Sequence, residues 1–225
     1  MIQADADVDL NPLGDRAWLA RFPSDARAAS WAEAVRRRSW AGAVEVVVAY
    51  HAVAVLIDPS KVDPETIEPL LRQVRPTEIS PRIGREFRVP VAYEGEDLVE
   101  ISATIGRPIG EIIAAHSGIT YSVRAIGFLP GFPYLGELAE ALAGLSRRPT
   151  PRTSVPAGSV AIAGRQTCIY PEASPGGWHL IGQTPLVLAD LASGFLPLAT
   201  GDRVRFEPIG RRRFQELQGC RLGEV

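Results

Sequence analysis

The fold is decided by the stretch Ser159-Val160-Ala161-Ile162-Ala163-Gly164-Arg165-Gln166-Thr167-Cys168-Ile169-Tyr170. Two runs of small and β-branched residues, 159–163 and 166–170, flank the pair Gly164-Arg165. A two-residue connection with glycine first is typical of a tight β-hairpin turn. The stretch therefore predicts two antiparallel strands joined at Gly164.

Similar short segments lie on both sides of this hairpin. Segments bounded by glycine and proline occupy residues 121–126, 178–181, 186–189 and 203–206. Evenly spaced strands with turn signals indicate an all-β barrel or sandwich. Two helices are expected before them: one at 98–106, with Asp97 and Glu100 as an acidic capping box, and one that opens at Pro108.

The first eighty residues have the pattern of a separate α+β domain. We expect strands at 17–22, 44–49 and 53–57, and 86–91 as a last strand. Apolar stripes predict a helix after Ser24 and another near Thr66, with Pro69 in its first turn. This βαββαβ order is that of a ferredoxin-like sheet. A linker-like stretch begins at Pro76. We therefore predict an α+β domain at residues 1–84 and a β-barrel domain at residues 85–225.

Composition excludes several classes of function. The 225 residues are 46% apolar with a net charge of −2, and Lys61 is the sole lysine, outside any glycine-rich phosphate loop. We expect a cytoplasmic protein with no membrane span and no nucleic-acid partner. Two widely spaced cysteines and three histidines give no metal-binding motif.

The densest chemical signal is the loop at residues 127–136, Gly-Phe-Leu-Pro-Gly-Phe-Pro-Tyr-Leu-Gly. Proline and glycine stiffen it and expose main-chain N–H groups, which can hold an anion or a developing oxyanion. The alternative is a rigid corner whose Phe132 and Tyr134 plug the barrel.

Three further positions carry open alternatives. Arg152, in a proline-stiffened loop, suits a carboxylate or phosphate, or is a surface charge. Gly177, in the pair before Trp178, indicates close approach of another backbone or a ligand. His116 is a weak acid/base candidate or a cap of its helix.

Taken together, these clusters resemble one family, the KipI/PxpB proteins, also described as allophanate hydrolase subunit 1 or carboxyltransferase subdomain C/D. The resemblance covers nearly the whole chain, from 12–17 through 116–118 and 127–136, then 149–152, 155–160, 166–167 and 170–171, to 174–178 and 201–204.

The resemblance implies a cyclophilin-like fold for the barrel and a multisubunit enzyme. With a PxpC-like (KipA) subunit and a PxpA-like subunit, such proteins form an ATP-dependent 5-oxoprolinase that cleaves 5-oxoproline to glutamate. ATP is expected in the complex, held with the partner. Alternative roles are inhibition of a histidine kinase, or a component of an allophanate hydrolase or biotin-dependent carboxyltransferase.

The resemblance also suggests which residues form the functional site. Its catalytic candidates are His116, Arg152 and Gln166, with Gln166 bonded to substrate. Its substrate- or anion-binding candidates are Pro130, Gly131, Phe132, Tyr134, Gly158, Gly177 and Gln183. The chain departs from the family pattern at Arg165, Cys168, His179 and Gln183. The family usually carries arginine where Gln183 lies, so a positive charge is lost there, while Arg165 adds one nearby.

Overall fold

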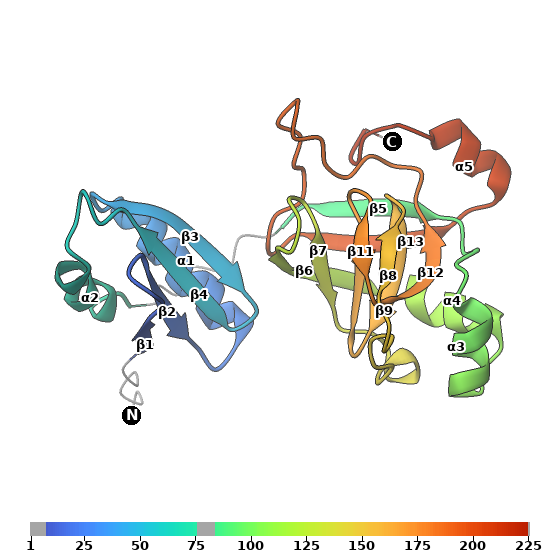
Figure 1. Cartoon of the computed structure of the whole chain (residues 1–225), viewed down its shortest axis with the longest axis horizontal. Helices are drawn as coiled ribbons and strands as arrows, with labels where there is room; N and C mark the ends of the chain where they lie inside the picture. The colour runs from blue at the N-terminus through green and yellow to red at the C-terminus, as the bar shows by residue number, and fades with distance from the viewer. Residues whose placement is uncertain (1–7, 76–83, 225) are drawn as a thin grey trace. The chain divides into compact units, whose positions relative to one another are not determined.

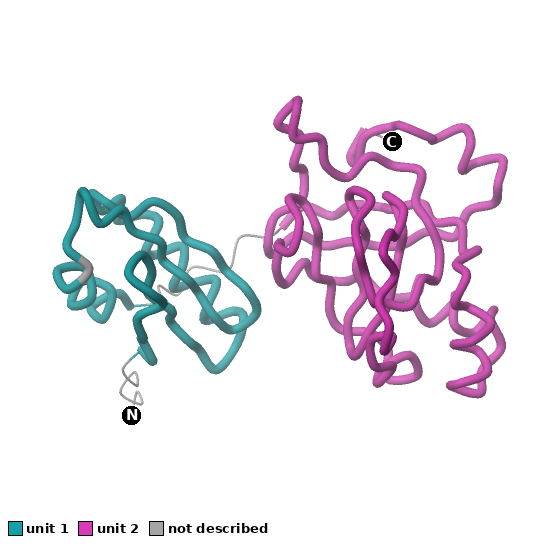
Figure 2. Tube along the Cα trace, viewed as in Figure 1, with its two compact units in different colours: residues 1–83 teal, residues 84–225 magenta. Residues whose placement is uncertain are grey.

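The structure is a computed structural model that describes residues 8–75 and 84–224. The chain divides into two compact units, residues 1–83 and 84–225 (Figure 2). The predicted linker start at residues 76–82 lies outside the described residues.

The N-terminal unit is a four-stranded antiparallel sheet in the order β1-β2-β4-β3. The strands are β1 (Asp9–Pro12), β2 (Ala17–Arg21), β3 (Ala43–Ala49) and β4 (Ala52–Ile57). β2 and β3 flank β4, each antiparallel to it, which is the expected split βαβ arrangement. The prediction that residues 86–91 complete this sheet is wrong, because β1 takes the edge beside β2 and 86–91 pairs elsewhere.

Two helices belong to this unit. α1 (Asp25–Arg38) is capped by the Ser24 side chain, as predicted. α2 (Pro64–Arg72) begins earlier than expected, at an Asp63 cap, so Pro69 lies inside the helix and not in its first turn. The predicted stripe of α2 is buried except for Leu70, which is exposed.

The C-terminal unit is a seven-stranded sheet in the order β12-β9-β10-β7-β6-β13-β5 (Figure 1). Its strands are β5 (Glu86–Val91), β6 (Thr120–Ile126), β7 (Pro133–Gly136), β9 (Ser159–Ala163), β10 (Gln166–Ile169), β12 (His179–Gln183) and β13 (Arg203–Pro208). The predicted hairpin is confirmed: Ala163 pairs with Gln166, and Gly164 has φ +59°. Reciprocal hydrogen bonds between Ala92 and Gln183 join the two edges, so the sheet is nearly closed.

Helices and a small hairpin complete the unit. They are α3 (Leu98–Ile105), α4 (Ile109–Ser117), the 3₁₀ turn η1 (Glu140–Leu142), α5 (Arg211–Leu217) and the hairpin β8 (Arg152–Val155) with β11 (Ser174–Gly176). α3 ends at Gly106 and α4 follows Pro108, as predicted. The predicted capping box is wrong, because the Asp97 side chain makes no cap bond to α3.

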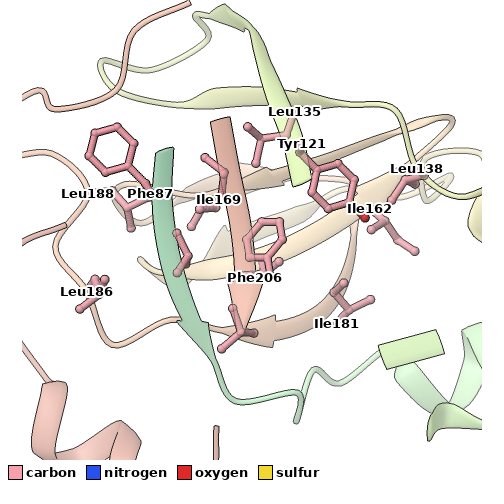
Figure 3. Packing of buried hydrophobic residues seen from close by; sticks show 14 of the residues in the cluster. Phe87, Tyr121, Leu135, Leu138, Ile162, Ile169, Ile181, Leu186, Leu188 and Phe206 are labelled. Atoms are coloured by element: carbon pink, nitrogen blue, oxygen red, sulfur yellow. The ribbon is translucent and has the colours of Figure 1, made fainter. Parts of the chain in front are cut away.

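The strands β9, β10 and β12 are buried on both faces. Large side chains from different strands meet in the barrel interior, among them Tyr121, Ile162, Ile169, Ile181 and Phe206 (Figure 3). The alternate residues form a second, aromatic cluster, the outer layer: Phe132, Val155, Ala161, Ala163, Cys168, Tyr170, Trp178 and Leu180. Burial on both sides keeps the β9–β10 hairpin rigid.

Two strand assignments differ from the sequence prediction. Residues 186–189 are not a strand: Leu186 and Leu188 are buried, and Val187 bonds the C-terminal segment at Cys220 and Leu222. Apolar side chains alternate here because Leu186 and Leu188 are buried, although the segment forms no regular ladder of hydrogen bonds with a neighbouring strand. Conversely, the second half of the predicted loop, Pro133–Gly136, is β7.

At Gly95 the close approach of β12 requires a glycine. A Cβ on Gly95 would lie 2.3 Å from the Leu180 carbonyl oxygen, whereas Gly110 on α4 has no neighbour within 4 Å. We predict that Gly95→Ala destabilises the barrel unit by about 1–3 kcal/mol, because backbone must move. Gly110→Ala should instead stabilise it by about 0.5–1 kcal/mol. Calorimetric unfolding measures both, and equal shifts would contradict the assignment.

Candidate functional site

A cavity of about 360 Å³ opens at the end of β12. Four segments of the barrel unit line it: Ala92 and residues 94–96 after β5, Pro156 and Ser159 before and in β9, Leu180, Gly182 and Gln183 of β12, and Arg211, Phe214 and Gln215 of α5. The ligand-facing groups are two carboxylates, one guanidinium, two amides and a hydroxyl. A pocket with few polar groups among apolar walls is suited to a small polar molecule.

Two predicted binding residues lie at this cavity. Gln183 lines it and donates from Nε2 to the Ala157 carbonyl at 2.7 Å. Gly158 is adjacent, at φ +78°, and a Cβ there would lie 2.4 Å from the Thr184 carbonyl oxygen. Gly158 thus lets the 156–159 turn pack against the chain beyond β12, which holds Gln183 at the rim.

The wall formed by residues 94–97 is fixed by a buried carboxylate. Asp97 is 3% exposed, and its Oδ2 accepts the Leu180 N–H at 2.7 Å. Its Oδ1 accepts from Arg148 Nη1 at 2.9 Å and from Arg152 Nη2 at 2.7 Å. A buried charge is tolerated when it is paired and hydrogen-bonded in this way.

Arg152 joins this carboxylate to the cavity rim. Its Nε lies 2.8 Å from Oε1 of Glu96, a cavity residue whose side chain is 64% exposed. Burial alone would lower the pKa of Arg152, yet hydrogen bonds and charge from Asp97 and then Glu96 raise it. Arg152 is therefore a fixed cation with one permanent partner, Asp97, and one exchangeable partner, Glu96.

Arg211 supplies the opposite wall with a cation. Its Nε contacts both carboxylate oxygens of Glu94, at 3.0 and 3.2 Å. The hydrogen bond and charge of Glu94 raise the pKa of Arg211. Both residues are exposed, so the pair contributes little stability and can open for a ligand.

The 127–132 turn does not line this cavity and offers few free amides. Pro130 has no N–H, and the Phe132 N–H donates to the Leu129 carbonyl at 3.0 Å. Gly131, at φ +76°, is buried against Ala189. Of these three predicted anion-binding residues, only Gly131 has a main-chain donor left, so the geometry does not form a two-donor oxyanion site.

Tyr134 packs against the outer layer, and Gly177 directly precedes one of its members, Trp178. Tyr134 packs edge-on against Trp178, with ring centroids 6.0 Å apart, and burial raises its pKa. Gly177 faces Arg148 and Pro151 at ordinary contact distance. Phe132 is the centre of the layer, in contact with Tyr134, Tyr170 and Trp178. This matches the alternative in which the aromatics fill space.

His116 is enclosed inside the barrel unit. Thr167 donates its hydroxyl to the Ala161 carbonyl, so its Oγ1 accepts from His116 Nε2–H at 2.9 Å. Nδ1 then accepts from the Tyr93 hydroxyl at 2.7 Å. Burial lowers the pKa of His116 to about 3. A neutral, doubly bonded ring with no exposed surface supports the barrel and is not placed to exchange protons with a substrate.

Gln166 is separated from the cavity. It begins β10 beside the hairpin turn, whereas Ser159 lies at the other end of the same hairpin. Four residues of strand place the two ends about 13 Å apart. Of the predicted residues, Gln183 lines the cavity, Gly158 lies in the adjoining 156–159 turn and Arg152 reaches the rim through Glu96. The cavity lining does not include Gln166, His116, Gly177 or residues 130–134.

The described residues show neither a metal-binding cluster nor a membrane-spanning helix. Within residues 8–75 and 84–224, no group of three or more His, Cys, Asp or Glu side chains is arranged to hold a metal ion. Across the same residues, no helix has the length and apolar character to span a bilayer.

Comparison with known proteins identifies the family. The family model "carboxyltransferase domain, subdomain C and D" matches residues 8–194. The chain belongs to this family. The family resemblance read from the sequence is thereby confirmed.

Curated relatives are named as components of 5-oxoprolinase, in each case the one designated B. The protein of Escherichia coli O157:H7 is 40% identical over 79% of this chain and 84% of its own. The protein of Haemophilus influenzae is 39% identical over 88% of this chain and 97% of its own. That of Bacillus subtilis is 32% identical over 91% and 94%.

Solved structures share the fold. TTHA0988 is similar with a TM-score of 0.77 and 37% identity over 87% of this chain, which spans only 40% of that longer chain. The Kluyveromyces lactis urea carboxylase has a TM-score of 0.72 over 96% of this chain and 23% of its own, at 19% identity, a likeness of fold alone.

Sequence reasoning missed the acidic side of the site. Glu94, Glu96 and Asp97 surround Gly95, and Arg148 lies four residues before Arg152. The acidic cluster and the pair of arginines could have indicated that these two segments form ion pairs with each other. Arg211 was visible only as part of a basic run, and its position beside Glu94 depends on how α5 packs.

The buried histidine predicts a pH dependence of stability. The folded state keeps His116 neutral down to about pH 3, whereas the unfolded chain binds a proton below 6.5. The contribution of the neutral His116 ring to the free energy of unfolding is therefore fully present above pH 6.5. It falls by up to about 1.4 kcal/mol per pH unit below that pH. His116→Gln should lose this part of the slope between pH 6.5 and 5 in urea denaturation. Parallel curves for the two proteins would contradict the assignment.

Proposed function

We propose that the chain is the B component of an ATP-dependent 5-oxoprolinase, which converts 5-oxo-L-proline, ATP and water to L-glutamate, ADP and phosphate. The observation that carries the proposal is the near full-length identity to proteins named as that component, 39% over 97% of the Haemophilus protein. It acts with a PxpC-like and a PxpA-like subunit, in the cytoplasm, where ATP is available.

The cavity is the part of this chain proposed to meet the small molecule. 5-Oxoproline carries a carboxylate, and a guanidinium binds carboxylates with directed hydrogen bonds. At Arg152 the exposed Glu96 occupies Nε, and a substrate carboxylate can take its place while buried Asp97 keeps the guanidinium oriented. Gln183 and Ser159 add polar contacts without charge.

ATP is proposed to bind with the partner subunits. This chain has one lysine and no glycine-rich phosphate loop. Its contribution to lactam opening is therefore to position the substrate and to stabilise charge near Arg152. Because Gln183 is neutral where the family pattern usually has arginine, Arg211 is the cation that lines the cavity, and Arg152 reaches the rim through Glu96.

The test is reconstitution. The chain is co-expressed with the PxpC-like and PxpA-like subunits, and glutamate release from 5-oxoproline is measured with and without ATP. We expect ATP-dependent release by the complex and none by this chain alone. A stable complex without release would refute the proposal and direct attention to amide-hydrolase or carboxyltransferase chemistry.

Variants test the site within that complex. Arg152→Gln should lower kcat/KM at least tenfold, about 1.4 kcal/mol, because a charge-assisted bond is lost. Arg88→Gln is the control, since Arg88 is an exposed β5 residue paired with Glu207.

Gln166→Ala distinguishes the cavity from the substrate-binding role that the sequence suggested for Gln166. Turnover should be unchanged if the cavity is the site, and reduced if Gln166 binds the substrate.

A further inference from the structure

Two loops of the barrel unit expose an apolar surface, here called the Phe128 surface: Phe128 and Pro130 after β6, with Leu191 and Leu196 between β12 and β13. Phe128 is 62% exposed and Leu191 60%. The second loop projects beyond the barrel strands in Figure 1. Among the described residues of 84–224, the one other exposed large aliphatic or aromatic side chain is Val99, alone on α3.

The two loops form one surface because they touch. A Cβ built on Gly131 would lie 2.8 Å from the Ala189 Cβ and 3.3 Å from Leu196 Cδ2. Only a glycine allows this approach at φ +76°. The side chains that flank the contact, Phe128 and Leu196, therefore belong to a continuous patch.

Both loops are preorganised. Hydrogen bonds from the Gly127 N–H to Phe132 and from the Phe132 N–H to Leu129 close the first loop. In the second, Asp190 caps the turn by accepting the Ala192 and Ser193 N–H groups. A rigid surface loses little conformational entropy on binding.

Phe128 is held outward in a costly conformation. Its φ is +72°, a left-handed value that a bulky aromatic residue rarely adopts and that costs about 1–3 kcal/mol. The ring touches Phe132 edge-on with centroids 5.4 Å apart, yet remains largely in solvent. Strain and exposure at one aromatic residue are together characteristic of a site that a partner completes.

The surroundings have the anatomy of a protein interface. Asp190, Ser193 and Arg221 form a polar rim, with Arg221 bonded to Asp190 at 3.0 Å. Beside Leu196 lies a hollow of about 730 Å³, walled partly by Phe195 and Pro197. An apolar centre with an aromatic anchor and a polar rim is typical of protein–protein contacts.

We propose that the Phe128 surface docks the separate polypeptide that carries the remainder of the carboxyltransferase domain. This inference rests on the proposed function, which makes the chain one subunit of several. The family model names subdomains C and D, and TTHA0988 contains this part within a chain more than twice as long. Where the rest is not covalently attached, a surface of this chain must hold it.

The experiment measures affinity and turnover separately. Calorimetric titration with the PxpC-like partner is carried out for the full chain, its Phe128→Asn/Leu196→Ser variant and a Val99→Gln control, and the 5-oxoprolinase activity of each is assayed in the three-subunit mixture. Asparagine is chosen because it tolerates the left-handed conformation. We expect the double variant to bind at least about 30-fold more weakly. The control should stay within about twofold, and turnover should recover at saturating partner.

The outcomes are distinguishable. Unchanged affinity of the folded double variant overturns the inference and leaves the proposed function intact. Tight binding by the unmodified chain without oxoprolinase activity overturns the function, and the affinity ratio still tests the surface. If the unmodified chain is a dimer in solution and the double variant a monomer, the surface joins two copies and the inference is wrong.

Discussion

The barrel unit depends on one buried carboxylate. Asp97 receives the Leu180 N–H from β12 and guanidinium groups from Arg148 and Arg152. It thereby ties together the start of α3, the β8 hairpin and the strand that carries Gln183. Without it, Arg148 and Arg152 would keep only the exposed carboxylates of Glu100 and Glu96, and the buried Leu180 N–H would lose its acceptor, which together costs several kcal/mol. The positions of the 94–97 wall of the cavity and of Arg152 follow from this interaction.

The same unit separates two tasks on different loops. The cavity at the end of β12 combines exchangeable ion pairs with rigid walls, which suits a small polar ligand. The Phe128 surface combines strain, exposure and a polar rim, which suits a protein partner. The outer layer centred on Phe132 lies beneath the first of its loops and supports it. The stiff 127–136 loop, which the sequence marked for anion binding, is thus better explained as part of an interface.

Periodicity, turn residues and cap residues predicted the elements that interactions between neighbouring residues determine. The hairpin at 159–170 follows from its alternation and from Gly164, and α1 follows from Ser24 and its apolar stripe. The pairing of β1, the burial of Asp97 and the enclosure of His116 depend on contacts between residues tens of positions apart, which periodicity does not encode. For that reason the sequence pattern singled out Arg152 but not its carboxylate partners Glu96 and Asp97. Asp97 was instead assigned to a helix cap, the role that its spacing to Glu100 favours.

The most direct test of this account is a double-mutant cycle on Asp97 and Arg152. Native-state hydrogen exchange at the core amides of β9 and β10 gives the free energy of opening of the barrel unit for the unmodified chain, Asp97→Ala, Arg152→Ala and the double variant. The account predicts that Asp97→Ala alone costs about 3–5 kcal/mol. It also predicts that the double variant is less destabilised than the sum of the single variants by about 1–3 kcal/mol. Effects that add to within about 0.5 kcal/mol would show that the two side chains do not stabilise each other and would contradict it.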